Sequence, residues 1–176
     1  MDDMDRRLLS ALRDCGTDRR VAGAARALSW AGEHAALWLA VGLVGAAADG
    51  ERRTAWLRGT ALTAAAHLTS MGAKRVVRRP RPSAGAGAAA GAEPLVRTAG
   101  RYSFPSSHAA SAAAAVVAYG ALRPVGARLV PPLAAAVCVS RMVVGVHYPS
   151  DVAAGAVMGA LAARLGARWM VGGVEK

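Results

Sequence analysis

The chain of 176 residues has few of the residues on which some classes of small protein depend. Its two cysteines, Cys15 and Cys138, can form at most one bridge, which excludes a disulfide-stapled scaffold. A formal net charge of +11 would suit a nucleic-acid-binding protein. However, only one phenylalanine is available for base stacking, and the sequence has no zinc-ligand spacing or RNA-binding aromatic motif. We therefore expect no nucleic acid among its partners.

Isoleucine, asparagine and glutamine are absent, and nearly all the basic residues are arginine. Lysine occurs only at Lys74 and Lys176. A position that keeps lysine against this bias indicates a need for a compact ammonium group, which differs chemically from a guanidinium. Lys74 is therefore a candidate functional residue.

Five apolar segments fill most of the chain after residue 26, at about 27–48, 55–73, 108–122, 127–147 and 150–170. Several have apolar cores short enough to be either buried core helices or membrane spans. Stretches such as Ala109–Ala118 lack the polar face that a soluble helical bundle requires, and their small residues let membrane helices approach closely. The pattern predicts an all-α, integral membrane helical bundle of about five transmembrane helices.

Residues 1–26 differ from the rest because they carry six arginines and five aspartates. Their apolar residues recur at helical spacing, at Met4, Leu8, Leu9 and Leu12. This pattern predicts an amphipathic helix lying on the membrane surface. No apolar stretch follows the first charges directly, so we do not expect a signal peptide. The predicted organisation is an interfacial segment over 1–26 and a transmembrane domain over 27–176.

Three groups of polar residues stand at the ends of apolar segments. The first is Lys74, six residues and Arg81-Pro82; the second is Pro105-Ser106-Ser107-His108; the third is Ser140-Arg141, five residues, His147, three residues and Asp151. If successive spans are antiparallel, all three groups fall on one side of the membrane. The sequence therefore predicts one cluster of cations, histidines, hydroxyls and a carboxylate.

Phosphoryl transfer is the chemistry that such a cluster suits. Arginine and lysine neutralise phosphate oxygens, and a helix that starts at Ser106–His108 offers backbone N–H groups to an anion. Two histidines can divide the roles of nucleophile and general acid. An acidic residue beside a membrane segment is costly unless it is paired, and His147 is the obvious partner of Asp151.

The three groups resemble the signature of the type 2 phosphatidic acid phosphatase family, K-x6-R-P, P-S-G-H and S-R-x5-H-x3-D, over Lys74 to Asp151. That family includes integral membrane lipid phosphatases and soluble vanadium haloperoxidases. The resemblance implies that His147 is the nucleophile that forms a phosphohistidine, that Asp151 orients it, and that His108 is the general acid and then the base. It also implies that no metal or cofactor is needed and that the substrate phosphate is bound by Lys74, Arg81, Ser106, Ser107 and Arg141.

Ser107 departs from the family pattern, which has glycine there. A serine would be strained if this position required a positive φ. Outside the signature, we expect His34 and His67 to be packing or interfacial residues and Glu33 to form an interfacial pair with His34. The basic residues Arg75, Arg78 and Arg79 are expected to contact lipid headgroups and to determine topology.

The sequence therefore predicts a metal-independent membrane phosphatase that hydrolyses a phosphomonoester or diphosphate on a lipid. Candidate substrates are phosphatidic acid, phosphatidylglycerol phosphate, a polyprenyl diphosphate and a decaprenylphosphoryl-5-phosphoribose-type intermediate of cell wall biosynthesis. The last is favoured because the chain resembles compact actinobacterial members of the family. One alternative is a vanadate-dependent haloperoxidase, which the short apolar chain disfavours. A non-catalytic lipid phosphate-binding membrane protein is another, but it would not need both histidines and Asp151.

Sidedness is predicted from the distribution of basic residues. With five spans, the N-terminus and the polar cluster share one face, which holds 14 of the 22 Lys and Arg residues against 8 on the other face. Because positive charge concentrates on the cytoplasmic side, we expect a multi-pass protein of the plasma membrane with its site facing the cytoplasm.

Overall fold

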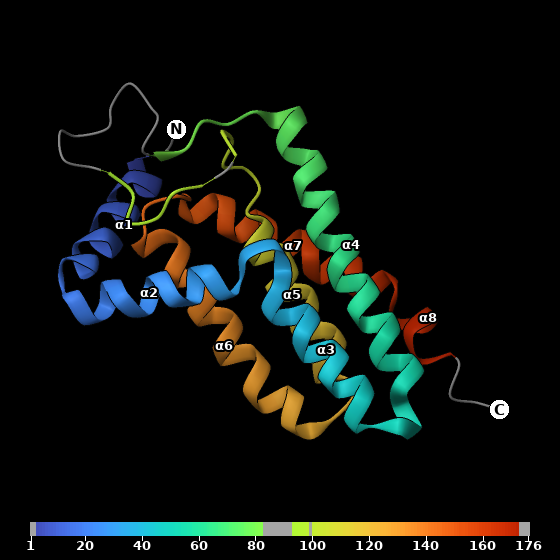
Figure 1. Ribbon diagram of the computed structural model, residues 1–176. Helices are drawn as coiled ribbons and strands as arrows, with labels where there is room; N and C mark the ends of the chain where they lie inside the picture. The colour runs from blue at the N-terminus through green and yellow to red at the C-terminus, as the bar shows by residue number, and fades with distance from the viewer. Residues whose placement is uncertain (1–2, 83–92, 99, 173–176) are drawn as a thin grey trace.

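The computed structural model describes residues 3–82, 93–98 and 100–172, and it is drawn in Figure 1. The chain between the Lys74–Pro82 group and the Pro105–His108 group therefore lies partly outside the described residues. Within them the regular structure is helical, and the only β-pairing is an isolated antiparallel bridge between Pro80 and Tyr102. The prediction of an all-α fold is confirmed.

The helices follow one another as α1 (Asp3–Asp14), α2 (Arg19–Ala31), α3 (Ala36–Ala48), α4 (Arg53–Val77), α5 (Ser107–Gly120), α6 (Pro124–Val143), α7 (Pro149–Leu165) and α8 (Ala167–Val171). Short 3-10 turns connect the first four, at Cys15–Thr17, Glu33–Ala35 and Gly50–Arg52. The last four predicted apolar segments correspond to α4, α5, α6 and α7.

Helix α5 is the centre of the molecule and packs against α4, α6 and α7 (Figure 1). It is mostly alanine and almost entirely buried, so its neighbours approach close to its backbone. On α7, a Cβ added at Gly155 would lie 2.3 Å from the Ser106 carbonyl oxygen, and one at Gly159 would lie 1.9 Å from that of Ala110. These two glycines, four residues apart, form the small-residue face that this packing requires.

Three aromatic rings anchor the end of the core that lies away from Ser107. The Tyr119 hydroxyl donates a hydrogen bond of 2.9 Å to the Trp38 carbonyl oxygen. The ring centroids of Trp56 and Tyr119 are 5.4 Å apart, and both side chains belong to the largest apolar cluster. These contacts fix α3 and α4 against α5.

The first predicted apolar segment, 27–48, is not one helix. It is broken at Glu33–Ala35, and α2 and α3 meet at a bend of 55°. Of the described helices, α6 alone is long and apolar enough to cross a membrane, and the α2–α3 pair passes the same test only if it is counted as one bent span. The predicted number of about five spans is therefore not confirmed by length and apolarity.

The N-terminal segment, predicted as one amphipathic helix, folds as α1 and α2. The break follows from Asp18, whose carboxylate accepts hydrogen bonds from the backbone N–H groups of Arg20 and Val21 and so caps α2. Helix α1 packs against α6 and α7 and buries Asp5 and Leu9. It is thus attached to the end of the bundle where α7 begins.

Candidate active site

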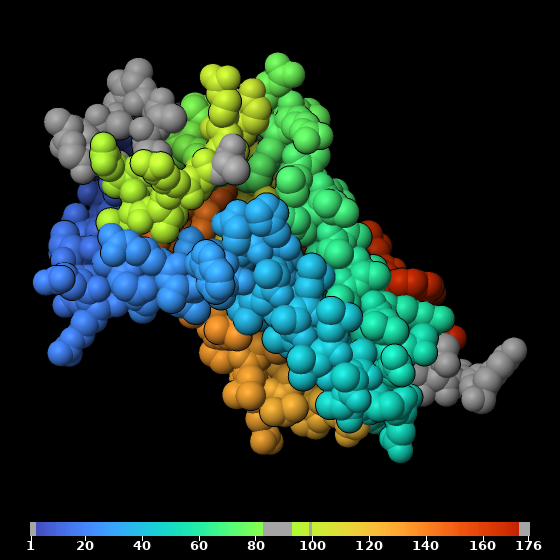
Figure 2. All heavy atoms as spheres, viewed as in Figure 1, coloured from blue at the N-terminus to red at the C-terminus, as the bar shows by residue number. Residues whose placement is uncertain are grey.

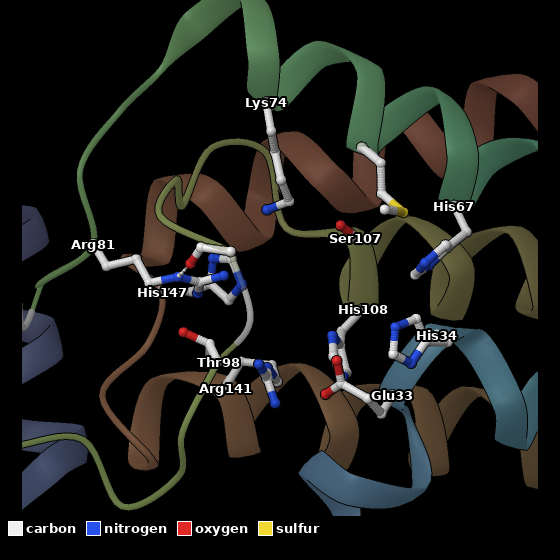
Figure 3. A pocket seen from close by; sticks show the side chains of 12 residues that line it. Glu33, His34, His67, Lys74, Arg81, Thr98, Ser107, His108, Arg141 and His147 are labelled. Carbon is white, nitrogen blue, oxygen red and sulfur yellow. Dashed lines mark hydrogen bonds and ion pairs between the residues drawn. The ribbon is translucent and has the colours of Figure 1, made fainter.

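A pocket with a volume of about 130 Å³ opens where α4 and α6 end and α5 begins. Figure 3 shows that its side chains converge from these helices, from the turn between α2 and α3 and from the segment before α5. The lining residues are Glu33, His34, His67, Met71, Lys74, Arg81, Thr98, Gly100, Ser107, His108, Arg141 and His147. The fold thus brings together one residue or more from each of the three polar groups of the sequence.

His147 lies in the connection between α6 and α7 and is 2% exposed. Its Nδ1 atom is 3.5 Å from Oδ2 of Asp151, which is fully buried in the first turn of α7. The same carboxylate oxygen accepts a 2.8 Å hydrogen bond from the Tyr148 backbone N–H, which caps the helix and fixes the carboxylate beside the imidazole. Burial, reinforced by Lys74, Arg141 and Arg81, lowers the pKa of His147 well below its usual value.

His108 lies in the first turn of α5 and is 5% exposed. Its Nε2 atom is 3.1 Å from the Ser29 carbonyl oxygen and 3.8 Å from Oε2 of Glu33. Because a carbonyl oxygen only accepts hydrogen bonds, this contact places a proton on Nε2. A general acid also carries a proton on Nδ1, so that it becomes neutral when it gives up the one on Nε2.

Three cations line the pocket without a carboxylate partner among the described residues. Lys74 Nζ donates to the Ser103 carbonyl oxygen at 3.0 Å, and Arg81 donates to the carbonyl oxygens of Gly100 and Val146 at 2.7 and 2.9 Å. Arg141 is 2% exposed and donates to the Ser29 hydroxyl, and its Nε atom has no partner in the described part of the chain. Buried positive charge without a counter-charge favours an anionic ligand.

The two serines at the start of α5 take different places. Ser107 lines the pocket, whereas Ser106 is fully buried behind it and its hydroxyl accepts a hydrogen bond from the Ala109 N–H as the helix cap. Ser107 is not strained, because positive φ among the described non-glycine residues occurs only at His34, Ala35 and Arg78. The departure from glycine at this position is therefore tolerated by the backbone.

Arg79 has a place that the sequence interpretation missed. Its guanidinium donates at 2.8 Å to Oδ1 of Asp151 and at 2.8 Å to Oδ2 of Asp5, so it joins the carboxylate beside His147 to helix α1. Asp5 also accepts from the Ser150 backbone N–H and hydroxyl. Burial alone would raise the pKa of Asp5, but the hydrogen bonds from Ser150 and Arg79 lower it overall, so this carboxylate is ionised. Arg79 is thus a partner of the site and not a headgroup contact.

Glu33, His34 and His67 were also predicted to lie outside the site, and the structure places all three in the pocket lining. His67 is two turns before Lys74 on the same face of α4, and that i, i+7 spacing was visible in the sequence. Glu33 and His34 enter the pocket because the backbone breaks between α2 and α3, which the continuous apolar run did not indicate. No group of three or more His, Cys, Asp or Glu that could hold a metal ion occurs in the described ranges.

Comparison with known proteins places this geometry in a family. The model of the PAP2 superfamily matches residues 54–173, which include α4 from its second residue and every described helix after it. The chain is 47% identical over 133 residues to a decaprenylphosphoryl-5-phosphoribose phosphatase of Mycolicibacterium smegmatis, covering 74% of this chain and 69% of that protein. It is 44% identical over 138 residues to the protein of the same name in Mycobacterium tuberculosis, covering 77% and 73%.

A solved structure has the same fold. The transmembrane PAP2-type phosphatidylglycerolphosphate phosphatase of Bacillus subtilis aligns with a TM-score of 0.57 over 94% of both chains, at 21% identity. The helical arrangement, the extent of the family match and the identity to the mycobacterial proteins agree. This chain belongs to the PAP2 superfamily.

Proposed function

We propose that this protein is an integral membrane phosphatase that hydrolyses a phosphomonoester on a polyprenyl-linked sugar, through a phosphohistidine intermediate. The observation that carries the proposal is the pocket, in which Lys74, Arg81 and Arg141 surround the space between two histidines. These three cations have no carboxylate partner among the described residues. The mycobacterial relatives, named for a polyprenyl phosphoribose, support a lipid-linked sugar phosphate as substrate.

The first half-reaction forms the phosphoenzyme. With the Nδ1 atom of His147 directed at Asp151, its Nε2 atom carries the lone pair that attacks phosphorus. The N–P bond forms as the bond between phosphorus and the leaving oxygen breaks, and the imidazolium of His108, protonated on both ring nitrogens when the phosphate is bound, gives its Nε2 proton to that oxygen. Lys74, Arg81 and Arg141 neutralise the equatorial oxygens, joined by the backbone N–H of Ser107, and Asp151 stabilises the positive charge that His147 acquires.

The second half-reaction returns the enzyme to its first state. His108, now neutral, takes a proton from water as the water oxygen attacks the phosphohistidine. The N–P bond breaks, inorganic phosphate leaves, and His147 is neutral again. Asp151 remains an ionised carboxylate throughout, so every proton is exchanged through His108.

The proposed membrane arrangement has five crossings, α3 to α7. Their ends alternate so that the starts of α3, α5 and α7 and the ends of α4 and α6 meet at the pocket, while α1 and α2 lie at the same face. In this arrangement residues 1–26 are interfacial and the site lies at the cytoplasmic surface of the plasma membrane. A substrate whose lipid tail stays in the bilayer can then present its phosphate at the helix ends.

Phosphate release by the purified protein in detergent tests the function. We expect release from decaprenylphosphoryl-5-phosphoribose in buffer with a metal chelator, and complete loss in His147→Ala. A His108→Ala variant quenched during turnover should retain labelled phosphate in an acid-labile, alkali-stable bond to protein. Full activity of His147→Ala would refute the mechanism. Oxidation of bromide by added hydrogen peroxide on the vanadate-loaded protein, without phosphate release, would indicate a haloperoxidase.

A further inference from the structure

The pocket extends past His108 to a second group of polar side chains, Glu33, His34 and His67 (Figure 3). We propose that these three residues, called here the alcohol subsite, bind hydroxyl groups of the leaving alcohol. They thereby favour a phosphate ester of a lipid-linked sugar over one of a diacylglycerol. This inference rests on the proposed phosphatase function and adds to it the residues that choose the substrate.

In-line displacement determines where the alcohol lies. The nucleophile and the leaving oxygen lie on opposite sides of phosphorus, so the alcohol is directed away from His147 and toward its proton donor. Figure 3 shows His108 between His147 on one side and the alcohol subsite on the other. The part of the alcohol next to the scissile oxygen is therefore placed against Glu33, His34 and His67.

The chemistry of the alcohol subsite suits hydroxyl groups. His67 is 8% exposed, and its Nδ1 atom has no hydrogen-bond partner in the described part of the chain. The carboxylate of Glu33 is only half buried and faces His108 across 3.8 Å, which leaves it able to accept from a hydroxyl group. Sugar hydroxyls both donate and accept, whereas an apolar alcohol would leave the buried Nδ1 atom of His67 unpaired.

The backbone is strained where it builds the subsite. His34 and Ala35 have φ values of 52° and 62°, in the left-handed region that residues with a Cβ rarely occupy. A continuous helix through residues 27–48 would avoid both values and would carry Glu33 and His34 on its own surface. Such strain is retained mainly where the resulting side-chain positions are used.

The test compares two substrates that share the phosphate and differ in the alcohol. The ratio of kcat/KM for decaprenylphosphoryl-5-phosphoribose to kcat/KM for phosphatidic acid is measured for the detergent-purified full chain. The variants are Glu33→Gln and His67→Phe, which retain side-chain size, with Glu51→Gln as the matched control on the exposed turn before α4. Changes that act through His108 lower both rate constants and cancel in the ratio.

Loss of one hydrogen bond to a charged or buried partner should lower the ratio by roughly tenfold to a hundredfold in Glu33→Gln and His67→Phe and leave it unchanged in Glu51→Gln. A substrate that lacks one ribose hydroxyl should have a kcat/KM lower by a similar factor with the wild type. With the variant that has lost the partner of that hydroxyl, kcat/KM should change little. Equal losses on both lipids would overturn the subsite while leaving the phosphatase function intact. No phosphate release from either lipid by wild type would overturn both.

Discussion

The carboxylate of Asp151 contacts the Tyr148 backbone, the imidazole of His147 and the guanidinium of Arg79. Oδ2 accepts from the Tyr148 N–H at 2.8 Å and lies 3.5 Å from Nδ1 of His147, while Oδ1 accepts from Arg79. Asp151→Asn removes the negative charge. Because one position both accepts from Tyr148 and faces His147, the amide either keeps the helix cap and turns its NH2 group toward Arg79, or presents its NH2 group to His147 and loses the cap. We expect kcat to fall by about 10³–10⁴-fold with the melting temperature in detergent changed little. Retention of more than about a tenth of the rate would contradict a charge-stabilising role.

Arg79 and Asp5 position that carboxylate from outside the pocket. Arg79→Gln frees Oδ1 of Asp151, and Asp5→Asn weakens the second ion pair of Arg79, which keeps its hydrogen bonds to Asp151 and to the Ser150 hydroxyl. Each change should lower kcat by about tenfold and leave KM nearly constant, because neither side chain lines the pocket. The double variant should be no worse than Arg79→Gln. The exposed Arg75→Gln is the matched control, and additive losses would mean that the two residues act separately.

The pKa of His147 determines the acid limb of the pH–activity profile. Its pKa is lowered well below the usual 6.5, first by burial and then by Lys74, Arg141 and Arg81. The nucleophile must be neutral, so activity persists as the pH falls until it passes the lowered pKa. We therefore expect the acid limb of kcat/KM to lie well below pH 6.5. The profile is measured from about pH 4 to 10. Loss of activity on lowering the pH with a midpoint at or above pH 6.5 would contradict this assignment.

At the scale of elements, the turn between α2 and α3 supports the general acid. A Cβ added at Gly32 would lie 2.7 Å from Cδ2 of His108 and 3.3 Å from Val137, so Gly32→Ala must displace the imidazole or the turn. We expect kcat to fall by about tenfold to a hundredfold, because small misplacements of a catalytic group are costly. Gly23→Ala, within the preceding helix α2, is the control, because a Cβ added there has no neighbouring atom within 4 Å. Equal activity of the two variants would show that Gly32 is not needed for the placement of His108.

The segment 93–98 covers the same end of the molecule. Figure 2 shows it lying over α2 near the end of α4. The Leu95 N–H donates to the Val144 carbonyl oxygen at 3.0 Å, and the Leu95 carbonyl oxygen accepts from Arg26 at 3.2 Å. Leu95 and Val96 pack on Ala25 and on the valines after α6. This segment, which carries none of the three polar groups of the sequence, thus holds α2 against the connection that carries His147.

The sequence predicts best the elements whose ends carry local signals. Ser106 caps α5, and Pro149 with Asp151 starts α7, so both starts were predicted to within two residues. The break at Glu33–Ala35 was missed because apolar residues continue on both sides and no proline marks it. Arg79 could not be distinguished from Arg75 and Arg78 within one basic run. Its partner Asp5 is 74 residues away, a distance at which only packing brings the two together.

On the scale of the whole molecule, the charge pattern and the fold support one orientation. Helix α1, helix α2 and the pocket lie at one end, and the turn at Gly50–Arg52 with the start of α6 lies at the other. The pocket end carries 14 of the 22 Lys and Arg residues in the proposed five-span arrangement. A basic segment crosses a bilayer at high cost and is retained on the cytoplasmic side, so the pocket is expected there.

Thiol labelling tests this orientation with a residue the chain already has. Cys15 is exposed at the pocket end, whereas Cys138 is partly buried and can be replaced by alanine. In spheroplasts, a membrane-impermeant maleimide should leave Cys15 unmodified until the membrane is permeabilised. The matched reporter is Glu51→Cys in a chain lacking both native cysteines, because Glu51 is exposed at the opposite end, and it should react at once. The reverse pattern would place the site on the outer face. The substrate phosphate would then have to be presented from the outer leaflet, which would favour lipids recycled there over intermediates assembled in the cytoplasm.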